Sequence, residues 1–171
     1  MVIGNMVLNR LITILALITG FCLYSQNQLG NDIDGAAAND NFGKGVSISG
    51  DGSIVAIGAL ENDSNGNASG HVRVYQWNNS TLNWDQLGND IEGENSTDFS
   101  GYTVSLSDDG SRLAIGSYGN DDNGTNAGAI KVYQWNSSTL IWDQLGSDIL
   151  GEAAGDNFGF SLSLSDDGNR L

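Results

Sequence analysis

The chain has 171 residues, with 24 glycines, no proline, and 21 acidic against 6 basic residues, for a net charge of −15. Such a negative surface cannot neutralise a run of phosphates and is repelled by anionic lipid, which argues against nucleic acid and acidic membranes as partners. The hydrophobic content of 39% is too high for a disordered acidic tail and suits a globular β protein with many turns.

Residues 1–25 have the order of a secretory signal peptide. Arg10 precedes an apolar run from Leu11 to Tyr24, which is too short to span a bilayer comfortably. We therefore expect residues 26–171 to be exported, to lie outside the cell or on its surface, and to have no stable membrane span after cleavage. The single cysteine, Cys22, lies in the leader, so the exported part cannot rely on disulfides.

The remainder of the chain repeats itself with a period of 58 residues. Residues 28–85 align without a gap with residues 86–143, and 33 of 58 positions are identical. A third, shorter copy occupies residues 144–171. Self-similarity with a period of about 40–60 residues is typical of propellers and solenoids.

Each period contains four strand-like runs. In chain order the first copy reads VSIS at 46–49, IVAIGA at 54–59, HVRVYQW at 71–77 and WDQLG at 84–88, and the third copy begins again with LSLS at 162–165. Apolar residues alternate with polar or small ones in these runs, which is the period of a strand and not of a helix. In the second run the large Val55 and Ile57 face one side, while the small Ala56 and Gly58 face the other.

Four short antiparallel strands per repeat make one propeller blade. We therefore predict an all-β fold, an incomplete β-propeller of about two and a half blades, whereas a β-solenoid would have a much shorter period. Four tryptophans occupy the same places in both full copies, which favours packing between blades over a carbohydrate-stacking set; they are Trp77, Trp84, Trp135 and Trp142. Propellers close with about 4–8 blades. The sequence thus predicts a piece of a longer protein, or one that oligomerises to complete the ring.

The stretches DNFGKGVSISGDGSIVAIGA at 40–59 and DNFGFSLSLSDDGNRL at 156–171 resemble FG-GAP repeats, the blades of integrin-α-type β-propellers. They are also similar to repeats of secreted or surface proteins of bacteria, while SDDGSRLAIGS at 107–117 is similar to WD40-like and TolB-like propellers. The resemblance implies a module for adhesion or recognition. The proline of "GAP" is absent, because Leu60 and Tyr118 stand in its place.

FG-GAP members that bind calcium carry an acidic loop between the first two strands of the blade. Here that connection is only residues 50–52 or 108–110, too short to wrap an ion that needs six to eight oxygens. The family's calcium site is therefore not expected there.

A second acidic loop leaves calcium open as a cofactor. Glu61, Asp63 and Asn65 alternate before a glycine, like the front half of a calcium loop, and Asp121 and Asn123 recur in the next copy. No glutamate follows at the twelfth position, so the alternative is a turn-rich surface loop in which Asn, Asp and Gly serve the backbone.

Catalysis finds little support in the sequence. The only histidine, His71, is replaced by Ala129 in the next copy and is interpreted as structural, while Arg73 and Lys131 are expected to extend along a blade edge. We predict no enzymatic activity but an exported propeller module for adhesion or protein/glycan recognition at the cell surface, or a scaffold in a larger secreted protein. The alternative is part of a carbohydrate-active or other propeller enzyme whose catalytic residues lie outside this chain.

Overall fold

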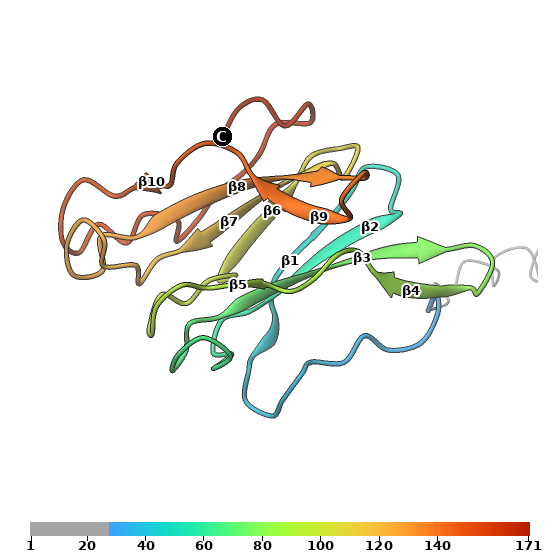
Figure 1. Cartoon of the computed structure of the whole chain (residues 1–171), viewed down its shortest axis with the longest axis horizontal. Coiled ribbons are helices and arrows are strands. Elements are labelled where there is room, and N and C mark those ends of the chain that lie inside the picture. Colours follow the sequence, from blue (N-terminus) through green and yellow to red (C-terminus); the bar gives the residue numbers. More distant parts are fainter. Residues whose placement is uncertain (1–27) are drawn as a thin grey trace, which may run out of the picture.

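The computed structural model describes residues 28–171, which form two antiparallel β-sheets without a helix (Figure 1). The predicted signal peptide, residues 1–25, lies outside the described part of the chain. Within that part, no helix is long and apolar enough to cross a membrane.

The first sheet, blade 1, is a meander in which each strand pairs with the next along the chain. Its strands are β1 (Phe42–Ile48), β2 (Ile54–Ala59), β3 (His71–Asn78) and β4 (Asn83–Gln86), and β5 (Ile91–Glu92) also pairs with β3. β4 and β5 lie end to end along the same edge of β3, so the fourth strand of the blade is divided in two; the strand predicted at 84–88 corresponds to β4, and β5 lies beyond the predicted range.

The second sheet, blade 2, repeats this arrangement. Its strands are β6 (Thr103–Leu106), β7 (Arg112–Ser117), β8 (Ala129–Asn136), β9 (Ile141–Gln144) and β10 (Ile149–Leu150), with β9 and β10 sharing the edge of β8. The all-β fold and the four-stranded blades are thereby confirmed. Residues 28–171 form two adjacent blades and no closed ring (Figure 1).

One predicted strand is absent. Residues 162–165 run beside blade 2 without forming a ladder, and Ser165 N–H donates its bond to Arg170 O at 2.8 Å. In the complete blades the same segment pairs with the next strand over several residues. A strand requires a neighbouring strand to pair its backbone groups, and among residues 28–171 only the first residues of that neighbouring strand are present.

The core lies between the blades. Ile54, Ala56, Val72, Val74 and Ile91 of blade 1 pack against Val104, Leu106, Leu113, Ile115 and Trp142 of blade 2. As the sequence predicted, Val55 and Ile57 face the opposite side of β2, where they pack with Tyr75. The small residues of β2 face the neighbouring blade because its backbone approaches there: a Cβ on Gly58 would lie 2.0 Å from Gly101 O.

Hydrogen bonds between blades recur with the period of the sequence. Gly50 N–H donates to Asp108 O at 2.8 Å, and Asp108 N–H donates to Asp166 O at 2.9 Å. In the same way, Leu106 N–H donates to the Ser47 hydroxyl oxygen at 2.9 Å. The serines in the first strand of one blade thus accept hydrogen bonds from backbone N–H groups of the next blade, which have no partner within their own sheet.

The tryptophans of blade 2 pack against blade 1, as predicted, while those of blade 1 contact the segment that precedes it. Trp142 Nε1–H of blade 2 donates to Leu87 O of blade 1 at 3.0 Å, and Trp84 Nε1–H of blade 1 donates to Leu29 O of the preceding segment at 3.2 Å. Each tryptophan also lies beside its cross-strand partner, with ring centroids 5.5 Å apart for Trp135 and Trp142. Their placement follows from packing between blades.

Replacing Trp142 with phenylalanine is expected to lower the free energy of unfolding by about 1–3 kcal/mol, because Leu87 O loses its donor in a partly buried place. Trp84 makes the same bond to Leu29 O in an exposed place. Trp84→Phe is therefore the matched control, with a loss of less than about 1 kcal/mol. Urea unfolding of both variants measures the difference, and equal losses would contradict the assignment of Trp142 to the interface between blades.

Blade 1 leaves one apolar face open. Val46 and Ile48 of β1 are each 58% exposed, whereas the equivalent Val104 and Leu106 of β6 are 9% and 7% exposed under blade 1. Covering of this face by further blades or a second copy of the chain stays a prediction. Light scattering coupled to size-exclusion chromatography tests it, and a stable, soluble monomer would contradict it.

Candidate functional site

The loops that join β2 to β3 and β7 to β8 lie at one end of the blades, together with the connections that enter and leave each blade (Figure 1). A pocket of about 400 Å³ opens there in blade 1. Three segments line it: the approach to β1, the β2–β3 loop, and the connection from blade 1 to blade 2. The lining residues are Ala38, Asn39, Asp40, Glu61, Asp63, Asn67, Ala68, Thr97 and Phe99. We call it the rim pocket.

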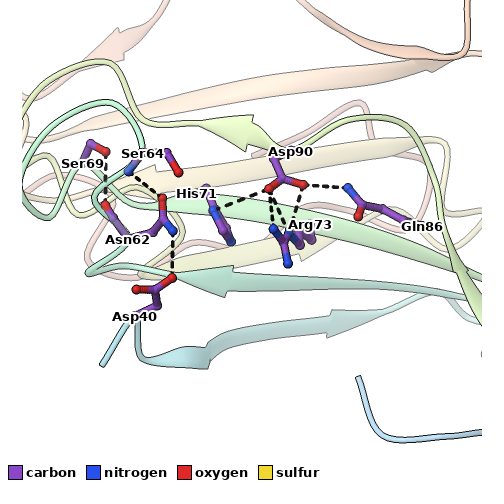
Figure 2. Close-up of polar contacts among 8 residues, drawn as sticks. All are labelled: Asp40, Asn62, Ser64, Ser69, His71, Arg73, Gln86 and Asp90. Atoms are coloured by element: carbon purple, nitrogen blue, oxygen red, sulfur yellow. Dashed lines mark hydrogen bonds and ion pairs between the residues drawn. The ribbon is translucent and has the colours of Figure 1, made fainter. Parts of the chain in front are cut away.

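A buried polar network fixes the loops around the rim pocket. Asn62 donates from its amide to Asp40 at 2.8 Å, and its side-chain oxygen accepts the Ser64 N–H at 2.9 Å. Its backbone carbonyl accepts the Ser69 hydroxyl at 3.2 Å (Figure 2). Asp40, Asn62 and Ser69 are all buried. Because buried polar groups are costly to leave unpaired, this network holds the pocket in one shape.

Blade 2 keeps part of this network: Asp98 and Asn120 stand at the equivalent positions and are also buried, and the Asn120 side-chain oxygen accepts the Asp122 N–H at 3.1 Å, while Ala127 replaces Ser69. Burial raises the pKa of Asp98, while bonds from the Asn95 backbone and the Asn120 side chain act against that rise. The buried residues that hold these loops in place thus recur in both blades, whereas the exposed residues of the loops differ from blade to blade.

Phe99 forms an aromatic wall of the rim pocket. Its backbone has φ of 55°, the left-handed region, and the equivalent positions in the other copies are Asn41 (54°) and Asn157 (52°). Asparagine tolerates this conformation, whereas a bulky residue is strained in it by about 1–2 kcal/mol. The Phe99 ring stacks on Tyr118, with centroids 5.0 Å apart and planes 4° from parallel.

The stack continues away from the pocket. Tyr118 meets Tyr102 edge-on at 4.7 Å, Tyr102 meets Phe160 at 4.8 Å, and Lys44 Nζ lies 4.8 Å from the Tyr102 ring centre. Phe99, Tyr102, Tyr118 and Phe160 thus form one group of contacting rings, which we call the rim aromatic cluster. Tyr118, at the place of the family's proline, lies in the middle of it.

Of the proposed calcium ligands in blade 1, two line the rim pocket and one does not. Glu61 and Asp63 line the rim pocket, and Asp63 also accepts the Ala68 N–H at 2.8 Å. Asn65 points elsewhere, because its amide donates to Gly93 O at 2.9 Å and to Glu94 O at 3.3 Å. The structure therefore brings Glu61 and Asp63 to one pocket and uses Asn65 to tie the loop to the next connection.

The equivalent loop of blade 2 is arranged alike. Asp121 accepts the Asn126 N–H at 2.7 Å, and the Asn123 amide donates to Gly151 O at 2.8 Å. Neither residue lines the rim pocket. Calcium binding by these five side chains stays a prediction.

Arg73 and Lys131 hold ion pairs, so the expectation that they extend along a blade edge is wrong. Arg73 Nε and Nη2 donate to the Asp90 carboxylate at 2.8–3.0 Å (Figure 2), and Lys131 pairs with Glu94 and with Asp148. Each cation secures the connection that divides the fourth strand. The sequence signal was available, because a cation and an aspartate recur 17 residues apart in both copies.

Both pairs shift the pKa values of their members. Burial alone would raise the pKa of Asp90, but hydrogen bonds from Arg73 and Gln86 outweigh it and hold that pKa below its ordinary value. Burial alone would lower the pKa of Lys131, but its bonds to Glu94 and Asp148 raise it. These charges stabilise the blades in their ionised forms.

Comparison with known proteins identifies the repeat. Residues 33–75 and 92–133 each match the family described as FG-GAP repeat, and the two matches together span about half of the chain. The first covers β1, β2 and most of β3, and the second covers β6, β7 and most of β8. No curated protein matches the chain as a relative.

Proposed function

The chain belongs to the FG-GAP repeat family, and on that premise we propose that it is a non-catalytic recognition module of a secreted or cell-surface protein, which binds a ligand in the rim pocket. FG-GAP repeats typically occur in extracellular proteins, which supports the proposed location. The near-identical blades support a scaffold role for the sheets, with recognition left to the loops that vary.

Phe99 carries the proposal. At this position the other two copies have asparagine in the same left-handed backbone conformation, which asparagine tolerates better. Retaining a strained phenylalanine at the wall of a pocket is typical of a functional position, because strain persists where the surroundings and a ligand over-determine the conformation. The Phe99 ring is only partly buried, and Tyr118 supports it from behind.

The chemistry of the rim pocket favours a neutral oligosaccharide. Three carboxylates line it, those of Asp40, Glu61 and Asp63, and no cationic side chain does, which disfavours an anionic ligand. Carboxylates and the amides of Asn39 and Asn67 suit the hydroxyl edges of a sugar. The Phe99 ring suits the apolar face of a sugar, because aromatic side chains offer a flat apolar surface at low conformational cost.

Phe99→Asn is expected to weaken ligand binding by about tenfold or more, because it removes the central aromatic contact. The variant restores the residue of the other copies, so its unfolding midpoint is expected to change little: relieved backbone strain offsets the lost stack on Tyr118. A glycan array identifies the ligand, and isothermal titration calorimetry compares the affinities.

Leu82→Asn is the matched control. Leu82 has φ of 52° and is 66% exposed, but it lies in the β3–β4 turn, at the other end of the blade. This substitution should leave binding unchanged. An array without a bound neutral glycan would overturn the ligand class, and full affinity in Phe99→Asn would overturn the site.

A further inference from the structure

His71 and Glu92 interrupt the symmetry of the two blades at one place. In blade 1 they lie directly opposite each other on β3 and β5, and in blade 2 the corresponding pair is Ala129 and Leu150. Directly opposed residues of an antiparallel pair have their side chains on the same face. Two independent departures from the repeat thus put an imidazole and a carboxylate side by side, where blade 2 has two apolar side chains.

The imidazole of His71 is fully buried and unsatisfied. Its side chain has 0% exposure, and neither ring nitrogen has a hydrogen-bond partner among residues 28–171. Nδ1 lies 3.8 Å from Asp90 Oδ2, which is too long for a hydrogen bond (Figure 2). Burial lowers the pKa of His71 against the pull of Asp90. An imidazole nitrogen that has no hydrogen-bond partner can bind a metal ion.

Asp90 is held in one orientation by its partners. Its carboxylate accepts four hydrogen bonds: two from Arg73 Nε–H, which is shared between Oδ1 and Oδ2, one from Arg73 Nη2 and one from Gln86. Arg73 therefore fixes the direction of the Asp90 carboxylate, as outer partners of metal ligands commonly do. Its positive charge also offsets part of the negative charge at this place.

Glu92 completes the group. Donor atoms of His71, Asp90 and Glu92 all lie within 4.8 Å of one another. The carboxylates of Glu92 and Asp90 lie close together, so they repel each other without a cation between them. Glu92 is exposed and Asp90 is half-buried, so the outer side of the group meets solvent.

We propose that His71, Asp90 and Glu92 form a binding site for one divalent transition-metal ion of the Zn²⁺ type. One imidazole and two carboxylates are ligands that suit Zn²⁺, and a fourth position stays open to water. The nitrogen ligand disfavours Ca²⁺, which takes oxygen ligands. The site lies in the blade itself and is independent of the oligosaccharide proposed for the rim pocket.

The single histidine makes the test direct. In a chain purified without a histidine tag and carrying Cys22→Ser, one imidazole resonance reports on His71 alone. Zn²⁺ is expected to shift this resonance to saturation at one equivalent. Co²⁺ should give a visible absorption band at the same stoichiometry.

Two substitutions introduce into blade 1 the residues that blade 2 has at the same positions, and blade 2 folds with those residues. Glu92→Leu is expected to weaken Zn²⁺ binding by about tenfold or more, and His71→Ala to abolish the cobalt band. Asp122→Asn is the control, because Glu94, Asp122 and Asp148 form an acidic group without a histidine, and it should leave binding unchanged. Circular dichroism verifies folding. An imidazole resonance that does not move at excess Zn²⁺, or equal binding by Glu92→Leu, would overturn the site even if His71→Ala failed to fold.

Discussion

Ile115→Ala is expected to lower the free energy of unfolding by about 2–5 kcal/mol, among the largest effects of any single substitution in the chain. Ile115 is 1% exposed and belongs to the core between the blades, where it packs with residues of both sheets. Truncation would leave a cavity between two packed sheets. The loss of stability rises with the volume of the cavity that remains after the neighbouring side chains have relaxed. Denaturant unfolding measures this loss.

The repeat provides a control of identical chemistry. Ile57 occupies the equivalent place in β2, is 8% exposed, and packs on Val55, Tyr75 and the segment before β1, with no blade over it. Ile57→Ala is expected to cost at least about 1 kcal/mol less than Ile115→Ala, because loosely held neighbours relax into the space. Equal losses would mean that the contact between blades contributes nothing beyond burial within one blade.

Gly58→Ala is expected to destabilise the chain by about 3 kcal/mol or more, although replacing glycine with alanine in a compatible strand normally stabilises. The added Cβ would lie 2.0 Å from Gly101 O and 2.7 Å from Gly101 C, both of them backbone atoms. No rotamer change can relieve such a clash, so β2 must separate from the connection that leads into blade 2. Thermal unfolding would show a lower midpoint.

Gly146→Ala separates this steric effect from glycine's conformational freedom. Gly146 has φ of 72°, and a Cβ there would have no atom within 4 Å. Only backbone strain of about 1–2 kcal/mol is expected. A loss for Gly58→Ala no larger than that for Gly146→Ala would show that the blades separate at little cost.

The strands were predictable because the repeat presents each pattern twice. Alternation of Val46 and Ile48 with serines, and the two unequal faces of residues 54–59, depend only on local geometry and appear in the structure as β1 and β2. The break between β4 and β5 does not follow from alternation. Asp90 lies in that break and pairs with Arg73 of β3, and its only sequence signal is the cation and aspartate that recur 17 residues apart in both copies.

The candidate site was predictable only in part. The acidic loop drew attention to Glu61 and Asp63, and both line the rim pocket. Phe99 was overlooked, because a lone aromatic residue near a turn has no periodicity, and its left-handed backbone is visible only in three dimensions. The difference between His71 and Ala129 is visible in the sequence, but the pairing of His71 with Glu92 is visible only in the sheet.

The bonds between blades have a consequence for how such a gene changes. A donor in one blade finds its acceptor 58 positions further on, as Gly50 does in Asp108 and Asp108 does in Asp166. The junction between blades 1 and 2 and the junction between blade 2 and residues 144–171 therefore share these backbone bonds. Duplicating or deleting one period within an array would create a junction already present elsewhere in it. A change in the number of periods would therefore leave the backbone bonds between neighbouring blades intact.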